Sequence, residues 1–381
     1  MGLFDKKEAK ASRVGRLMQL ETLGRAAWTP RDYASLAREG FAKNPIVFRC
    51  VRMIAEAAAS APWLLYDGDA EVDRHPLLAL LARPNPAQSG VALLETLYGH
   101  LMVAGNAYLE AVALDGVPRE LFALRPDRMT VVPGPDGWPQ AFQYKAGSRT
   151  VEFLQVGDVP PVLHLSLFHP LNDHYGFAPI EAAQTSLDIH NASGAWSKAL
   201  LDNAARPSGA LVYTGEGNLS DEQFERLKSE LEDGYTGSRN AGKPMLLEGG
   251  LDWKTMAMSP RDMDFIEAKN QAAREIALAF GVPPMLLGIP GDNTYANYRE
   301  ANRAFWRHTV LPMVNRTAQA LSGWLSPAFG AALKLSFDAD QIEALSEERE
   351  ALWARVAAAD FLTRDEKRLA VGYGIDECGD A

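Results

Sequence analysis

Apolar residues recur at helical spacing over residues 259–281, in the last third of the chain. Ser259 followed by Pro260 is a typical helix start, because serine can cap the first turn and proline fits the first helical position. Gly281, with two prolines behind it, is a typical helix end. We therefore predict a helix that begins at Ser259 and ends at Gly281.

A longer helical pattern covers residues 295–324, with one apolar face and Pro312 inside it. Because proline removes a backbone donor and clashes with the preceding turn, we expect a kink between His308 and Pro312. The stretch between the two helices, residues 282–294, has an apolar beginning and a polar tip punctuated by glycine and proline. This composition predicts a loop.

The N-terminal part changes from helical spacing to strand spacing. Residues 1–40 hold scattered lysines and arginines with little apolar periodicity, so we expect a loosely ordered basic arm. A helix is predicted over residues 44–60, and two more on either side of the Pro84-Asn85-Pro86 break. Between residues 108 and 167, short apolar runs alternate with Gly, Pro and Asp turns, which predicts a β-rich region.

A small module of helix and strands is predicted between two long helices. The first long helix starts near Pro179 and runs to residue 205, and the second is the helix of residues 259–281. Between them, Ser220 and Gln223 have the spacing of a capping box, which predicts the start of a helix. Strands are predicted at residues 210–213, 245–248 and 251–255.

The C-terminal part predicts one strand and two acidic helices. The strand covers residues 333–337, and the second helix has Thr363 as its cap with Glu366 three residues later. Helices and short strands thus follow one another along the whole chain. We assign the fold class α+β.

The composition is that of a folded chain with an acidic surface. Of its 381 residues 47% are apolar and 23% are charged, and the formal net charge is -11. A protein that wraps nucleic acid tightly needs a basic surface, so the charge argues against that class. It fits both a channel through which DNA slides and a protein that never meets DNA.

The sequence offers no sign of a membrane or of a disulfide framework. It has no run of about 20 uncharged apolar residues, so we expect no membrane partner and a product that stays in the cytoplasm unless it is assembled into something larger. Cys50 and Cys378 lie far apart and without metal-ligand spacing. Because Cys50 lies in an apolar helical stretch, we expect a buried thiol there and no nucleophile.

Residues 237–244 come close to a nucleotide-binding P-loop. A P-loop needs a Ser or Thr hydroxyl after its lysine to hold Mg²⁺, and a helix whose N-terminus faces the phosphates. Here Pro244 follows Lys243, and a strand pattern comes next. We therefore interpret the stretch as a hairpin loop.

No other residues make a convincing catalytic or metal site. His164, His169 and His174, together with Asp173, have a spacing that fits neither a helix face nor a zinc site, so we expect core or loop roles. Nucleophile-elbow, zinc-protease and dinucleotide motifs are absent. We predict no catalytic residues, no metal and no cofactor.

Several short runs in the last third of the chain resemble the portal proteins of long-tailed bacteriophages and stand in the same order. They are Phe265-Ile-Glu267-Ala-Lys269, Glu275-Ile276-Ala277, Phe280-Gly281-Val282-Pro283-Pro284, Leu287-Gly288, Thr294-Tyr295-Ala-Asn297 and Thr309-Val-Leu-Pro312. Further similar segments cover most of the chain, from about Asn44 to Ala370. The resemblance implies a portal fold.

This resemblance also implies a division of the chain into named parts. They are a basic N-terminal arm (1–40), a wing (41–178), a first stem helix (179–205), a clip (206–258), a second stem helix (259–281), a tunnel loop (282–294), a long kinked wing helix with a strand (295–337) and short crown helices (338–381).

Candidate functional residues follow from the resemblance, residue by residue. They are Gly288, Ile289, Pro290, Gly291, Asp292, Asn293 and Thr294 in the tunnel loop, Arg261, Lys269 and Arg274 in the stem, and Arg239, Asn240 and Lys243 in the clip loop. The tip of the tunnel loop has Asp292 and Asn293 in place of lysines. Contact with DNA there would be steric and polar, without a phosphate clamp.

In function, the resemblance implies a non-enzymatic subunit of a dodecameric ring at one vertex of the capsid, in the virion. The ring would conduct double-stranded DNA, dock the terminase large subunit, and contact the major capsid protein and head-tail connector proteins. The source could be a phage, a prophage or a gene-transfer particle.

Two alternatives remain open. One is another structural virion protein, such as a minor head or tail component, which should lack the stem-clip-stem order. The other is a nucleotide-using enzyme, which would need a nucleotide or nucleophile site.

Overall fold

The computed structural model describes residues 28–68, 70–202, 209–214, 220–235, 250–255, 265–290, 295–330 and 333–372. Its helices are α1 (Tyr33–Leu36), a π-helical segment (Ala37–Ala42), α2 (Pro45–Ala59), α3 (Pro76–Ala82), α4 (Gly90–Ala104), α5 (Pro179–Ala182), α6 (Gln184–Asp202), α7 (Asp221–Tyr235), α8 (Phe265–Ala279), α9 (Tyr295–Phe305), a second π-helical segment (Trp306–Val310), α10 (Leu311–Phe329), α11 (Ser346–Ala357) and α12 (Arg364–Ala370). Its strands are β1 (Trp63–Asp67), β2 (Ala70–Glu71), β3 (Asn106–Leu114), β4 (Val117–Leu124), β5 (Met129–Pro133), β6 (Pro139–Ala146), β7 (Arg149–Leu154), β8 (Val162–Ser166), β9 (Gly209–Tyr213), β10 (Leu251–Thr255) and β11 (Leu333–Phe337). The predicted α+β class is confirmed.

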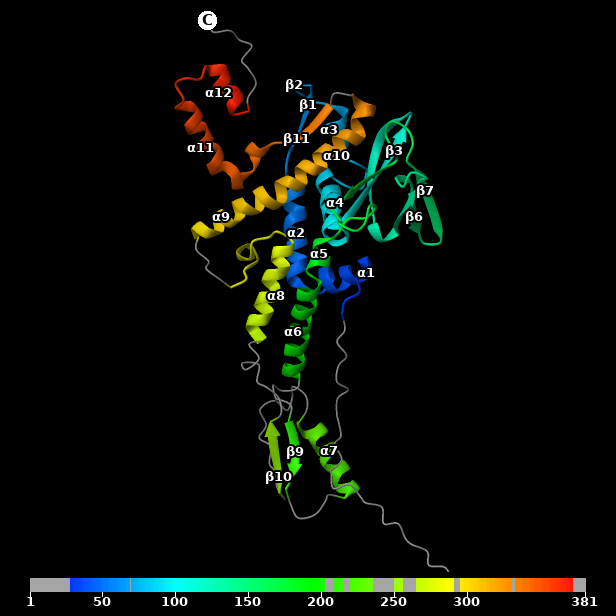
Figure 1. The fold of residues 1–381 in the computed structure, drawn as a ribbon, viewed down its shortest axis with the longest axis vertical. Coiled ribbons are helices and arrows are strands. Elements are labelled where there is room, and N and C mark those ends of the chain that lie inside the picture. Colours follow the sequence, from blue (N-terminus) through cyan, green and yellow to red (C-terminus); the bar gives the residue numbers. More distant parts are fainter. Residues whose placement is uncertain are drawn as a thin grey trace, which may run out of the picture.

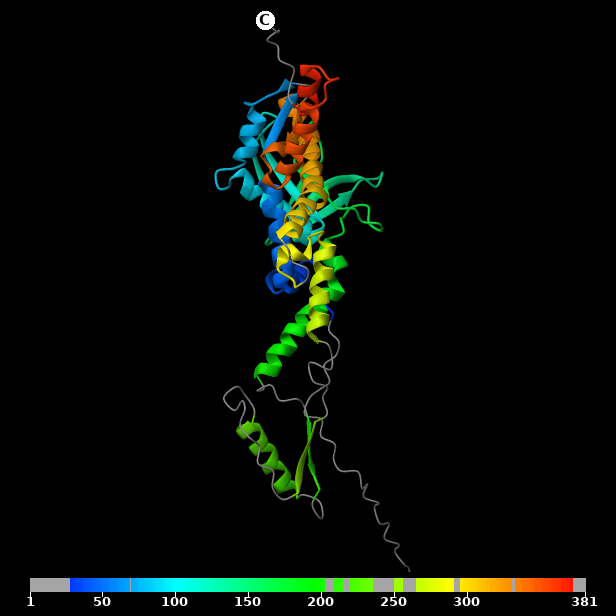
Figure 2. The same cartoon turned by 90° about the vertical axis from the view of Figure 1, so that its left-hand side faces the viewer.

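These elements are arranged along one long axis, as Figures 1 and 2 show. The helices α2, α4 and α10 and the sheets around them gather toward one end, which we call the body. The strand pair β9–β10 and helix α7 lie toward the other end. Helices α6 and α8 lie between the two and are the elements that carry the candidate site.

One continuous hydrophobic core fills the body. Helices α2 and α4 pack against each other, and Ile276 of α8 and Leu321 of α10 belong to the same buried cluster. Cys50 of α2 is part of this cluster, and burial raises the pKa of its thiol to about 12. The predicted buried thiol is thus confirmed.

The described strands form small antiparallel sheets of two or three strands. Their orders are β11-β1-β2, β4-β3-β8, β5-β6-β7 and β10-β9. The pairing of Trp63 in β1 with Phe337 in β11 brings the early and late parts of the chain into one sheet. Strands β3 to β8 confirm the β-rich region predicted between residues 108 and 167.

The expectation of loose order through residue 40 is wrong for residues 33–40. This stretch forms α1 and most of the first π-helical segment, and Leu36 is buried in the core. Gly40 packs so closely on α5 that an added Cβ would lie 2.2 Å from Ile180 Cδ1. Its order comes from these contacts with distant residues, which apolar periodicity within the stretch could not reveal.

The predicted long helix after the loop continues to Phe329, five residues past the expected end at Trp324. Where a kink was expected, the structure has the π-helical segment Trp306–Val310, and Pro312 stands at the start of α10. Because Pro312 has no N–H, the carbonyl of His308 lacks its usual helical donor, and a wider turn accommodates that loss.

The module between the long helices agrees with the prediction where the structure describes it. Strands β9 and β10 pair, and Ser220 and Gln223 form the predicted capping box, with the Gln223 amide donating to Ser220 Oγ over 3.2 Å. The predicted strand at residues 245–248 and the glycine-rich stretch at 237–244 lie outside the described residues. Among the described helices, none is both long and apolar enough to span a bilayer.

Candidate functional site

Helices α6 and α8, which fall within the two predicted stem helices, lie side by side (Figure 1). We refer to this pair as the stem. The buried face of α8 consists mostly of small residues, Ala272, Ala273 and Ala277, together with Ile276. Small side chains let two helix backbones approach closely. The first stem helix was predicted as one element, but the structure interrupts it at Ala183, between α5 and α6.

Polar and aromatic contacts fasten α6 to α8 along their length. Ser186 Oγ of α6 donates a hydrogen bond of 2.5 Å to Glu275 Oε2 of α8, and Gln271 supports the other carboxylate oxygen over 3.3 Å. Further along the pair, the rings of Trp196 and Phe265 stand 4.6 Å apart between centroids. The two helices therefore behave as one packed unit over the described length.

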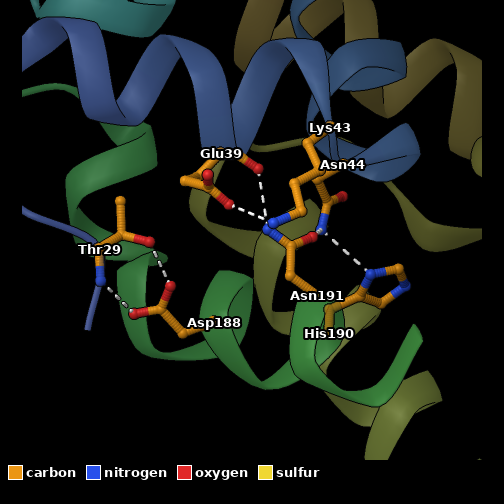
Figure 3. A network of polar contacts seen from close by, with 7 residues as sticks. All are labelled: Thr29, Glu39, Lys43, Asn44, Asp188, His190 and Asn191. Atoms are coloured by element: carbon orange, nitrogen blue, oxygen red, sulfur yellow. Dashed lines mark hydrogen bonds and ion pairs between the residues drawn. The ribbon is translucent and has the colours of Figure 1, made fainter. Parts of the chain in front are cut away.

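A polar cluster joins the stem to the first helices of the chain (Figure 3). Asn44 caps α2: its Oδ1 accepts from the amides of Ile46 at 3.0 Å and Val47 at 3.2 Å. Its Nδ2 lies 3.0 Å from His190 Nδ1 and donates to Asn191 Oδ1 over 2.9 Å, both on α6. One side chain thus serves both helices.

Other bonds surround this cluster (Figure 3). Asn191 Nδ2 donates to the Glu39 carbonyl over 2.8 Å, and the Glu39 carboxylate pairs with Lys43 at 2.6 Å. Nearer the start of α6, the Asp188 carboxylate accepts hydrogen bonds from Thr29 N at 3.0 Å and from Thr29 Oγ1 at 2.5 Å. These contacts hold residues 29–44 against α6.

The end of α8 is built around Gly281. It has the left-handed backbone φ of +67°, and Val282 N donates back to the Ala277 carbonyl over 2.9 Å, as in a Schellman cap. Thr309 Oγ1, from the second π-helical segment, donates to the Gly281 carbonyl over 2.6 Å. The helix end is therefore tied to the long helix that follows the loop.

The described root of the loop, residues 282–290, is anchored to α8. Ile289 is buried against Ala273 and Ala277, and Gly288 turns the chain with φ +71°. Arg274 Nη2 donates to the Pro290 carbonyl over 2.5 Å, while its Nη1 lies 3.4 Å from Glu267 Oε1. Arg274, predicted as a stem residue, here fastens the loop.

The remaining predicted site residues divide into two groups. Lys269 of α8 is half-buried near His190, whose pKa it lowers after the larger effect of burial. The others lie outside the described residues: Gly291, Asp292, Asn293 and Thr294 of the loop, Arg261 of the stem, and Arg239, Asn240 and Lys243 of the clip loop. Their roles stay predictions.

The histidines singled out from the sequence take part in packing and loop geometry. His164 stacks on Tyr108 with centroids 4.3 Å apart, and its Nε2 lies 3.0 Å from Asn106 Oδ1. Burial, with a smaller contribution from His174, lowers the pKa of His164 to about 4. His169 Nδ1 accepts from the Leu171 amide at 3.0 Å. Within the described ranges, no three His, Cys, Asp or Glu side chains gather as a metal site would require.

Sequence reasoning missed the cluster around Asn44. An Asn-Pro pair before an apolar helical run predicts the cap itself. The partners His190 and Asn191 stand 146 and 147 residues further along the chain, so no local pattern connects them with it.

This chain is similar to known proteins in sequence and in overall fold. The family model described as phage portal protein matches residues 45–372. The portal protein of Enterobacteria phage HK97 is 26% identical over 310 residues, which are 77% of this chain and 70% of that protein.

Two solved structures are also similar. A chain in the neck of an empty gene transfer agent (GTA) particle computed with C6 symmetry is 56% identical, with a TM-score of 0.74, covering 92% of this chain and 96% of that chain. A chain in the neck of a native GTA particle computed with C12 symmetry is 55% identical with a TM-score of 0.71 and the same coverage. Since the family model spans most of its length, this chain belongs to the phage portal protein family.

Proposed function

We propose that this chain closes into a ring of twelve copies at one vertex of a capsid, and that the ring is the channel for double-stranded DNA. The carrying observation is the 55% identity, over 92% of the chain, to a chain from a particle neck computed with C12 symmetry. The family itself is one of portal proteins. In this proposal the subunit has a structural and not an enzymatic role.

The stem carries surface that a ring would cover. Ile266 and Leu278 of α8 are 75% and 78% exposed in the single chain. A ring closes through heterologous contacts, in which one face of each subunit meets a different face of the next. Apolar side chains on the outside of the α6–α8 pair suit such a contact, because burying each would gain about 1.5–3 kcal/mol.

The charge of the stem suits a channel in which DNA slides. Arg274 is engaged by the Pro290 carbonyl and Glu267, so it is not presented as a phosphate clamp. With a net charge of -11 the whole chain repels phosphate more than it attracts it. We place residues 288–294 at the narrow part of the channel, where contact with the duplex is steric and polar.

The other parts have separate partners in this proposal. The module of β9, α7 and β10 docks the terminase large subunit and later a head-tail connector protein, while the body contacts the major capsid protein. The assembled subunit belongs to the virion, and before assembly it is in the host cytoplasm. Identity of 55–56% to chains in GTA particles supports a gene-transfer particle or a related prophage as the source.

The test is the mass of the purified protein by light scattering, followed by electron microscopy of the largest species. Leu278→Lys places a charge in the proposed contact while favouring the helix C-terminus. Leu114→Lys is the matched control, since Leu114 is 63% exposed at the β3–β4 turn. We expect rings with an axial hole from the parent and from Leu114→Lys, and monomers from Leu278→Lys.

Rings from Leu278→Lys would contradict the placement of the stem at the subunit contact. A parent chain that stays monomeric at high concentration and hydrolyses ATP would contradict the function.

A further inference from the structure

The cluster that joins α6 to α2 contains His190 (Figure 3), and its hydrogen bonds determine which ring nitrogen carries the proton. Asn44 must turn its oxygen toward α2, because Oδ1 accepts both cap bonds from Ile46 and Val47. Its NH₂ group therefore faces α6. There Nδ2 lies 3.0 Å from His190 Nδ1 and 2.9 Å from Asn191 Oδ1.

An NH₂ group has no lone pair to offer, so His190 Nδ1 must be the acceptor and its proton must be on Nε2. A protonated imidazole would direct an N–H from Nδ1 at the N–H of Asn44. Asn44 can turn its oxygen to His190 only by giving up both cap bonds of α2. Both routes are costly, because Asn44 is 1% exposed and His190 is 8% exposed.

The charges around His190 favour the neutral form. Burial is the main cause that lowers the pKa of His190, and the ammonium of Lys269 on α8 lowers it further. The nearby carboxylates already have partners. They are Glu39 with Lys43 on the N-terminal side, Asp188 with Thr29 on α6 itself, and Glu275 of α8 with Ser186.

We propose that Asn44, His190 and Asn191 form an acid-sensitive joint between the stem helix α6 and the body. The joint is closed while His190 is neutral and opens when the imidazole gains a proton. Opening removes the side-chain cap of α2 and releases α6 from residues 39–44. The first turn of α2 and the start of the stem loosen together.

The pH range follows from linkage. The closed joint holds the pKa of His190 below 6.5, the value of a free histidine, so the opened state binds the proton more tightly. The free energy that His190 contributes to the closed joint is therefore complete above about pH 6.5 and is lost as the pH falls below that value. All the groups belong to one chain, so the test of this proposal does not depend on ring assembly.

Hydrogen exchange of the full-length chain, read by mass spectrometry, tests the joint directly. Peptides covering residues 44–50 and 186–194 are compared at about pH 7.5 and about pH 5.5, on either side of the free histidine value. The β1–β11 strand pair, which contains no histidine, is the internal reference after correction for intrinsic exchange. We expect several-fold faster exchange of both peptides at the lower pH, with a ceiling of about tenfold for each pH unit.

Three variants make the result specific. His190→Asn keeps an acceptor near the position of Nδ1 but cannot titrate, so its two peptides should lose the acid response even if their exchange is faster at both pH values. Asn44→Asp keeps one oxygen on the α2 cap and turns its second oxygen toward Nδ1, where it favours the protonated imidazole. The exchange of both peptides should therefore become slower, not faster, at the lower pH. His308→Asn removes an exposed imidazole outside the cluster and should behave like the parent.

The outcomes that overturn the proposal are equally defined. One is a parent chain whose two peptides respond to pH no more than the β1–β11 strand pair. Another is a His190→Asn chain that keeps the acid response, and a third is an Asn44→Asp chain that keeps the direction of the parent.

Discussion

Replacing Gly281 by alanine should destabilise the root of the loop that follows α8 by a predictable amount. Gly281 has φ +67°, a conformation that costs an L-residue about 1–2 kcal/mol. In addition, the new Cβ would lie 2.7 Å from Thr309 Oγ1. Thr309 must then move and give up its 2.6 Å hydrogen bond to the Gly281 carbonyl, a loss of about 1 kcal/mol. We expect a total loss of about 2–3 kcal/mol in the free energy of unfolding.

Gly288→Ala is the matched control for this substitution. Gly288 has nearly the same backbone, φ +71°, in the same loop root, but no heavy atom lies within 4 Å of its added Cβ. It should therefore lose only the backbone contribution of about 1–2 kcal/mol. The difference between the two variants, about 1 kcal/mol, measures the Thr309 contact.

The assay is urea unfolding at a protein concentration where the chain is monomeric, with the midpoint compared at unchanged slope. In a Thr309→Ala background the clash is absent, so Gly281→Ala should then cost no more than Gly288→Ala. Equal losses for the two glycine variants in the parent background would refute the reasoning, and so would a Gly281→Ala loss that Thr309→Ala leaves unchanged.

Three further predictions concern the core. Ile276→Ala should cost about 2–5 kcal/mol in the same urea assay because Ile276 is fully buried, whereas Leu278→Ala on the exposed side of α8 should change stability by less than about 0.5 kcal/mol. Cys50, with a pKa raised to about 12 by burial, should resist alkylation in the folded chain and react in urea, as read by peptide mass spectrometry; modification of the native protein would contradict its placement. Burial lowers the pKa of His164 to about 4, so neutral His164 contributes roughly 3 kcal/mol to the free energy of unfolding, and this should be lost as the pH falls from 6.5 toward 4. Hydrogen exchange of β3 and β8 should rise over that pH range in the parent chain but not in His164→Gln.

Much of the fold could be predicted because its signals are local. The caps at Asn44, Ser220 and Thr363, and the glycine at 281, each mark a helix boundary that the structure has. The helix boundaries that were predicted wrongly depend on tertiary contacts. Residues 33–40 are helical because Leu36 and Gly40 pack on distant elements, and α10 continues past Trp324 through Pro327 because its last turns pack against β11.

The candidate site could be predicted only in outline, and the reason is instructive. The resemblance selected Arg274 as a stem residue, but the structure shows its guanidinium bonded to the Pro290 carbonyl. That partner depends on how the loop folds back. Asn44 has a cap signal that is complete in itself, so nothing in the sequence suggests that its second group has a partner on α6. A side-chain amide that uses its oxygen for a helix cap always leaves an NH₂ group to be satisfied when it is buried. A buried Asn cap therefore predicts an acceptor on a neighbouring element, and when that acceptor is a histidine nitrogen, as with His190, the packing of two helices becomes sensitive to a proton.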